Sequence, residues 1–154
     1  MTAHVLERRQ VVDGDLEAVF AFFEDPANLE AITPPWLNFE IVSATDPEVR
    51  EGTEFEYRLR WQHLPIRWRS RISDYHQGES FADEMLRGPY SRWFHRHLFR
   101  AVPDGVEITD RVEYTLPFGP LGRVVHRLLV RSQLEEIFDY RRDVIRQLFG
   151  GSDR

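Results

Sequence analysis

Two histidines and two aspartates are the residues of this chain whose types and spacing could support chemistry. His95 and His97 lie two positions apart in a segment that alternates like a β-strand, so both imidazoles should point to one face. If the next segment returns as a hairpin, His97 lies opposite Asp110, and Asp83 on the preceding strand lies near Trp93 or His95. Ionisable side chains are costly to bury unless they are paired. The cluster must therefore be bonded internally or contact a ligand.

Four uses of this cluster stay open at the level of sequence. The Asp–His pairs could satisfy one another as a purely structural network, or they could anchor the polar end of a ligand. Two histidines and a carboxylate can also hold a divalent metal, although histidine pairs at this spacing are common on strands. In acid–base catalysis, His95 or His97 would carry the proton while an aspartate sets its tautomer and pKa. We expect no metal and no cofactor, and these two histidines are the only catalytic candidates.

The face that carries the cluster is otherwise aromatic. Alternation along the predicted strands places tyrosine and tryptophan side chains around the histidines. Such rings usually fill a core, and where a core is incomplete they line a pocket for a hydrophobic molecule. The predicted ligand-binding residues are Tyr57, Trp61, Trp68, Asp83, Trp93, His95, His97, Asp110 and Tyr114.

The elements that must position these residues follow a simple order. Strand 4–12 is followed by short helices at 16–24 and 26–31 and then by strands at 39–44, 54–61, 66–75, 80–86, 92–101 and 106–116. Short connections between these strands indicate an antiparallel sheet of about seven strands. The chain ends in a long helix over 121–149. The fold class is α+β, with this helix lying across a curved sheet and a cavity between them.

The long helix is predicted from the spacing of its apolar residues. They recur at three and four positions, which is the pattern of one helix face. The side chains expected to meet the sheet are Leu121, Val124, Val125, Leu128, Leu134, Ile137, Phe138, Ile145, Leu148 and Phe149.

The opposite face of the sheet is rich in arginine. A four-residue hairpin loop at 62–65 would pair Arg60 with Arg67 and Arg58 with Arg69, giving a basic stripe. Such a stripe could contact a protein or an anionic membrane, which makes an interaction module one alternative function. A solvated face screened by nearby glutamates is the simpler interpretation.

Composition limits the remaining classes of function. The 154 residues are enough for one domain with one core, and the net charge of −6 argues against binding to nucleic acid. The sequence has no apolar run long enough for stable membrane insertion and no apolar segment in its charged N-terminal residues. It has no cysteine, so disulfides and thiolate sites are excluded. We expect a cytoplasmic protein with a single domain over 1–154.

Three segments carry a resemblance to a known superfamily. They are VFAFFEDPANLEAITPPWLNFEIV at 19–42, GPYSRWFHRHLF at 88–99 and DRVEYTLPFGPLG at 110–122. With the terminal helix they cover nearly the whole chain. The sequence resembles the START-like, SRPBCC superfamily of helix-grip proteins, which includes polyketide cyclases and aromatases. Within it, the chain is similar to a bacterial subgroup labelled cyclase/dehydrase or CDP-paratose-epimerase-like.

This resemblance implies a pocket under the helix for a hydrophobic or amphipathic small molecule, such as a lipid, polyketide or isoprenoid. The main alternative is a cyclase or dehydratase that acts on a polyketide-like substrate through His95 or His97. The epimerase label does not carry over, because the chain has no GxGxxG motif and no βαβ pattern. Similar domains occur beside Rossmann-type proteins, so an oxidoreductase partner stays open, as does a homodimer.

Overall fold

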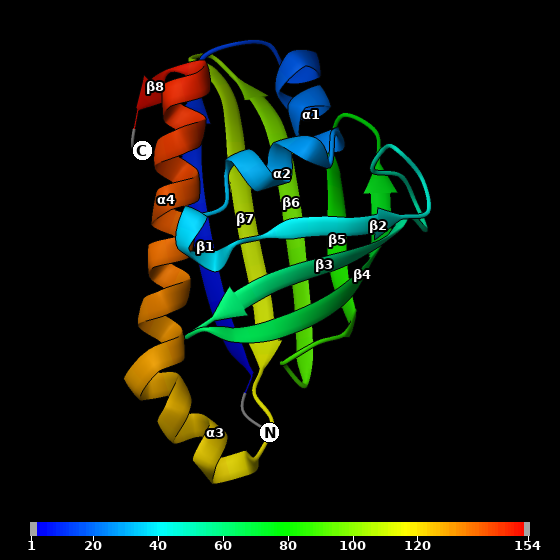
Figure 1. Cartoon of the computed structure of the whole chain (residues 1–154). Coiled ribbons are helices and arrows are strands. Elements are labelled where there is room, and N and C mark those ends of the chain that lie inside the picture. The colour runs from blue at the N-terminus through cyan, green and yellow to red at the C-terminus, as the bar shows by residue number, and fades with distance from the viewer. Residues whose placement is uncertain (1–2, 153–154) are drawn as a thin grey trace.

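The structure is one strongly curved antiparallel sheet with helices against its concave side (Figure 1). It is a computed structural model and describes residues 3–152. The strands are ordered β2-β3-β4-β5-β6-β7-β1-β8 across the sheet. Figure 1 shows β2 and β3 crossing in front of β6 and β7, with helix α4 standing along one side. The α+β architecture and the sheet of about seven strands are confirmed, with a short eighth strand added.

Most elements begin and end close to their predicted limits. The strands are β1 (His4–Val12), β2 (Glu40–Ala44), β3 (Glu54–Trp61), β4 (Leu64–His76), β5 (Ser80–Arg87), β6 (Arg92–Val102), β7 (Gly105–Thr115) and the two-residue β8 (Gly151–Ser152). Before β2 lie α1 (Leu16–Glu24), α2 (Ala27–Ala31) and the 3-10 turn η1 (Pro35–Leu37). Asp15 caps α1, because its carboxylate accepts a 2.8 Å hydrogen bond from the Ala18 amide.

The predicted length of the loop between β3 and β4 is wrong, because the loop has two residues rather than four. The chain turns through Gln62 and His63 alone, both with positive φ, and Trp61 pairs directly with Leu64. Two-residue turns of this kind match the twist of the strands that they join. The correct partner of Arg58 is therefore Arg67, and Arg60 lies opposite Pro65. Since the register moved by two residues, each side chain stays on its predicted face.

The C-terminal helix is continuous but not regular. It consists of α3 (Gly119–Val125), the π-helical turn η2 (His126–Val130) and α4 (Arg131–Phe149). A π-turn contains more residues than an α-turn, so the buried stripe in this region falls on Gly122, His126 and Val130. Gly122 packs so closely that a Cβ would lie 2.1 Å from the carbonyl oxygen of Pro117.

This geometry corrects the predicted apolar face of the helix. Leu134, Phe138 and Ile145 are buried as expected. Leu121, Val124, Leu128 and Leu148 are exposed instead. A regular period of 3.6 residues assigns these residues to the core, whereas the π-turn and the position of α3 beyond the end of the sheet leave the first three uncovered.

The core consists of two apolar clusters separated by a polar layer. One cluster packs α1 against the sheet and includes Phe20, Phe99 and Ile108. The other packs the middle of the long helix against Trp93 and Val112. The polar layer between them consists of His95, His97, Asp110 and Arg141, all buried. The core-facing residues of β6, β7 and α4 are therefore polar between the two apolar clusters.

Most arginines of the outer sheet face are paired with acidic residues, whereas Arg60 of the predicted stripe contacts the backbone carbonyl of His63. Arg58 contacts Glu40 at 2.9 Å, and Arg69 contacts Glu54 at 2.9 Å. Further pairs join Arg67 to Glu56, Arg71 to Glu84 and Arg96 to Asp74. The stripe is therefore a solvated face whose positive charge is largely balanced. Among the described residues, no helix is long and apolar enough to cross a membrane.

Candidate functional site

A cavity of about 430 Å³ lies between the sheet and the long helix. Its wall is overwhelmingly apolar and aromatic, and it receives side chains from the sheet, from α2, from the 88–90 turn and from the long helix between Leu121 and Arg141. β3 and β4 cross in front of β6 and β7 rather than running beside them (Figure 1), and the cavity lies in the space that these strands and the long helix enclose. Known ligand pockets occupy roughly 300–1,000 Å³.

One hydrogen bond closes the side of the cavity between strand and helix. The indole nitrogen of Trp61, at the end of β3, donates to the side-chain oxygen of Gln133 on α4 at 2.6 Å. Further along the wall, Trp68 and Trp93 meet edge to face with ring centroids 5.1 Å apart, and Tyr90 packs against both. Sequence reasoning missed Tyr90, which belongs to a turn rather than a strand.

Only part of the predicted ligand-binding set reaches this cavity. Its wall includes Tyr57, Trp61, Trp68, Asp83, Trp93 and His95. His97, Asp110 and Tyr114 do not line it. His97 faces a much smaller void near α1, while Asp110 and Tyr114 are covered by the side chains to which they bond.

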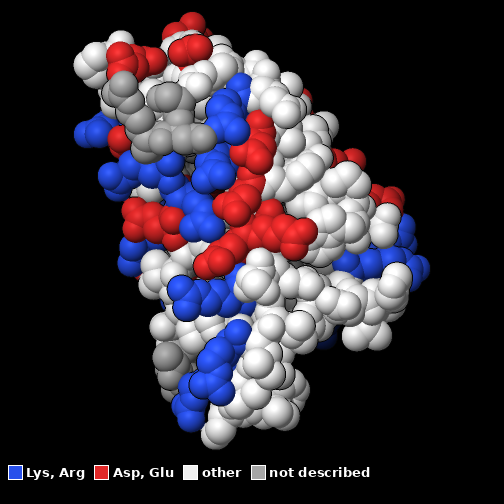
Figure 2. Space-filling model, turned by 90° about the vertical axis from the view of Figure 1, so that its left-hand side faces the viewer, with Lys and Arg blue, Asp and Glu red and all other residues white. Residues whose placement is uncertain are grey.

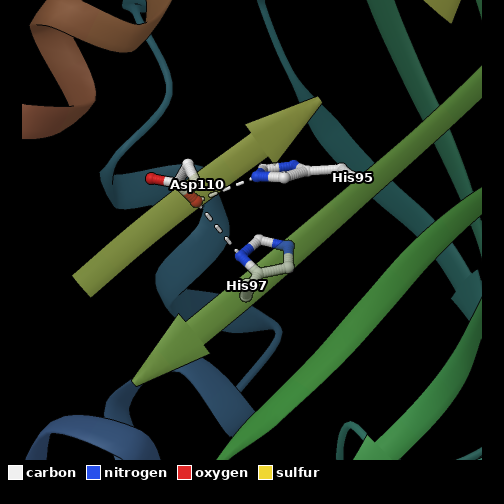
Figure 3. A group of neighbouring side chains, drawn as sticks. All are labelled: His95, His97 and Asp110. Carbon is white, nitrogen blue, oxygen red and sulfur yellow. Dashed lines mark hydrogen bonds and ion pairs between the residues drawn. The ribbon is translucent and has the colours of Figure 1, made fainter. Parts of the chain in front are cut away.

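Asp110 is the centre of the polar layer. Register places it opposite His97, as predicted, but its shortest contact is a 2.9 Å hydrogen bond to Nε2 of His95. Nδ1 of His97 lies 3.4 Å from the same carboxylate oxygen. Figure 3 shows the two β6 imidazoles converging on that oxygen from one side. The rings of His95 and His97 stack with centroids 3.8 Å apart.

Arg141 completes the layer, and sequence reasoning missed it. From α4 its guanidinium donates to both carboxylate oxygens of Asp110, at 3.2 and 3.1 Å, and to Nδ1 of His97 at 3.4 Å. Arg141 is only 5% exposed. A signal was available, because Arg141 occupies the gap in the apolar stripe between Phe138 and Ile145. A charged residue at a core position of a helix implies a buried partner.

The charges of the layer follow from these contacts. Burial alone would raise the pKa of Asp110, but Arg141 and the hydrogen bond from His95 hold that pKa well below its ordinary value. Burial, with His95 and Arg141 nearby, lowers the pKa of His97 to about 3. His97 is therefore neutral at physiological pH, and its Nδ1 can accept a hydrogen bond from Arg141. The core of the layer is an Arg141–Asp110 ion pair.

This ion pair bears on the metal hypothesis. Donor atoms of His95, His97 and Asp110 lie within 4.8 Å of one another, which is compatible with metal ligation. However, the Arg141 guanidinium already contacts both oxygens of Asp110 and Nδ1 of His97. A divalent cation there would require this buried guanidinium to leave, at a high electrostatic cost. The donor set does not fit a metal while Arg141 is in place.

Asp83 is the polar residue of the cavity wall with unused bonding capacity. It lies opposite His95 in the sheet, as predicted, and Tyr57 donates to its Oδ2 at 3.4 Å. Its Oδ1 is buried without a hydrogen-bond partner among the described residues. Burial raises the pKa of Asp83 above its ordinary value, and the neighbouring Ser70 and His95 offset only part of that rise. Unsatisfied buried oxygens are rare, so this one needs an explanation.

Tyr114 has a structural contact in place of the predicted ligand contact. Its hydroxyl lies 2.6 Å from Nε2 of His126, the buried residue of the π-turn. The imidazole of His126 also stacks on His4 with centroids 3.6 Å apart. Burial is the largest cause that lowers the pKa of both histidines. These contacts fix the π-turn to the sheet and so position α3 beside the cavity.

Comparisons with known proteins agree with this architecture. No protein-family model matches the sequence, and no curated protein matches it. Among solved structures, TTHA0849 from Thermus thermophilus is similar with a TM-score of 0.71 and 15% identity, over 95% of each chain. Major latex-like protein 151 from Panax ginseng is similar with a TM-score of 0.59 and 12% identity, over 87% of this chain and 96% of its own.

A third similar structure belongs to a protein whose name states a biosynthetic pathway. The di-domain ARO/CYC protein StfQ from the steffimycin biosynthetic pathway is similar with a TM-score of 0.70 and 12% identity. The match covers 92% of this chain and 49% of StfQ. At these identities the likeness establishes the fold. The chain has the helix-grip fold that the resemblance of its sequence motifs implies.

Proposed function

We propose that this protein binds a hydrophobic or amphipathic small molecule in the cavity between the sheet and the long helix. The observation that carries the proposal is the cavity itself, whose largely apolar wall includes a few polar side chains, among them Asp83 with its unpaired oxygen. A lipid-, polyketide- or isoprenoid-like molecule would place its rings or chain against the tryptophans and its polar end at Asp83.

The aromatic wall supports an apolar ligand. Trp68, Trp93 and Tyr90 all line the cavity and pack against one another at tilted and edge-to-face angles, so they form one continuous aromatic surface. Burying apolar ligand surface there is favourable by about 25 cal/mol per Å².

Asp83 supports a polar group at one end of the ligand. Its Oδ1 can accept a hydrogen bond from a ligand hydroxyl or amide, and a protonated carboxyl can donate one as well. Tyr57 lies beside it and holds the other oxygen in place. A ligand group that bonded Oδ1 would satisfy this unpaired oxygen.

Native mass spectrometry of protein purified from the cells that make it tests the proposal directly. We expect a retained small molecule whose mass is lost on denaturation. A second arm titrates the protein with the neutral dye N-phenyl-naphthylamine. Leu59→Trp puts an indole into the cavity and should abolish dye binding, whereas Val42→Trp on the exposed part of β2 should leave it unchanged. Equal dye binding by both variants would refute the cavity as the site.

An acid–base enzyme is the second candidate, and His95 is the observation that favours it. His95 lines the cavity while Asp110 fixes its Nε2, which is the arrangement of an oriented general base. His97 is neutral and does not line this cavity, so His95 is the better candidate for a proton carrier. The test is cyclisation of a poly-β-ketone. Activity that is lost in His95→Gln and kept in His97→Gln would favour an enzyme over a carrier.

A further inference from the structure

The first turns of the long helix leave large apolar side chains in solvent. Phe118 is 79% exposed, Leu121 63% and Leu128 68%. Val124 and Leu129, on the same segment, are also exposed. We call these five residues the apolar row; Leu121, Val124 and Leu128 belong to the helix face that the sequence predicts to be core. A concentrated exposed apolar patch usually marks a surface that contacts something else.

A row of arginines runs beside the apolar row. Arg123, Arg127 and Arg131 follow one another at four-residue intervals, so they lie along one side of the helix. Between residues 114 and 134 the chain has no acidic residue, although the whole chain carries a net charge of −6. Figure 2 shows the lower end of this face as blue and white atoms without red, whereas blue and red mix above it.

These arginines differ from those of the sheet. Within residues 3–152, Arg123 and Arg127 have no carboxylate partner, and Arg131 contacts Glu135 at 3.4 Å. Most arginines of the outer sheet face are paired with glutamates and aspartates, as described above. The segment beside the exposed apolar row therefore carries positive charge that no nearby acidic residue of the segment balances.

We propose that this surface docks onto an anionic lipid membrane. The apolar row would enter the boundary between headgroups and acyl chains, and the arginine row would contact lipid phosphates. A second copy of the chain fits less well, because a symmetric contact would bring the two arginine rows together. Reversible surface binding of this kind requires no membrane-spanning segment.

The position of the surface connects it to the cavity. Phe118, Leu121, Gly122 and Val125 all line the cavity as well. A docked molecule would therefore hold this end of the cavity against the bilayer, so that an apolar ligand could pass without crossing water. This last step rests on the proposed function, whereas docking itself does not.

Co-sedimentation with phosphatidylcholine vesicles, with and without phosphatidylglycerol, tests the docking. We expect the wild type to bind only the anionic vesicles and to lose binding as salt is raised. Each juxtamembrane arginine contributes about fivefold, so Arg123→Glu/Arg127→Glu should weaken binding by at least about 25-fold. Leu128→Ser should weaken it through the apolar row, since Leu128 does not line the cavity. The matched control Arg60→Glu/Arg67→Glu changes net charge equally on the sheet face and should bind like the wild type.

Four results would overturn the proposal. In the first, the wild type does not bind anionic vesicles. In the second, it binds neutral vesicles equally well. In the third, the helix and sheet variants lose vesicle binding equally. The fourth is a dimer in sedimentation velocity that Leu128→Ser dissolves, which would make a second copy the occupant. Circular dichroism melts of all variants show whether each remains folded, and a dye titration with N-phenyl-naphthylamine reports on the cavity separately from docking.

Discussion

The Arg141–Asp110 pair allows a quantitative prediction. The two side chains are each about 7% exposed and share two hydrogen bonds of 3.1 and 3.2 Å. Removing one partner of a buried ion pair typically costs about 3–5 kcal/mol, because the other charge stays buried. In Arg141→Met the Asp110 carboxylate keeps its bond from His95 and can also take up a proton, so we expect the lower end, about 3 kcal/mol. That is a large fraction of the stability of a typical domain.

The assay is urea unfolding at neutral pH followed by tryptophan fluorescence, with free energies from linear extrapolation. The matched control is Arg131→Met, which makes the same substitution on the same helix in an exposed pair with Glu135. It should cost no more than about 0.5 kcal/mol. The double variant Arg141→Met/Asp110→Asn should lose clearly less than the sum of the single variants, because the orphaned charge is gone. A cost for Arg141→Met equal to that of the control, or strictly additive losses, would refute the buried pair.

Three further predictions concern the other polar groups. The pKa of His97 is lower in the folded protein than its usual 6.5, so the unfolded chain binds the extra proton and stability falls as pH drops from about 6.5 towards 3. Urea midpoints should show this loss, at up to about 1.4 kcal/mol per pH unit, and His97→Gln should flatten it; an unchanged slope would contradict the assignment. Tyr114→Phe leaves Nε2 of His126 unpaired, so it should cost about 1–3 kcal/mol and speed amide exchange in 119–130 more than in α4. Tyr57→Phe/Asp83→Leu removes a buried oxygen without a partner together with the hydroxyl that bonds its neighbour, so melting should show an empty protein about as stable as the wild type, while retention of the native ligand falls; a large stability loss would show that Asp83 is structural.

Local sequence patterns determined much of the sheet. Alternation with a period of two residues assigns Asp83, His95 and His97 to one face, and the short β6–β7 turn sets His97 opposite Asp110. These features depend only on neighbours along a strand or across one hairpin. For that reason they survive an error in loop length, as the β3–β4 turn shows.

The tertiary structure decided which of these groups bond and which remain available. Arg141 reaches Asp110 from 31 residues away, and its height against the sheet depends on how the whole helix lies across the curved strands. That contact commits Asp110 and His97 to the core and leaves His95 and Asp83 on the cavity wall. The π-turn likewise exposes Leu121 and Leu128, which helical periodicity assigns to the core. Periodicity specifies a direction for each side chain, whereas a partner requires the relative placement of two distant elements, which no local pattern contains.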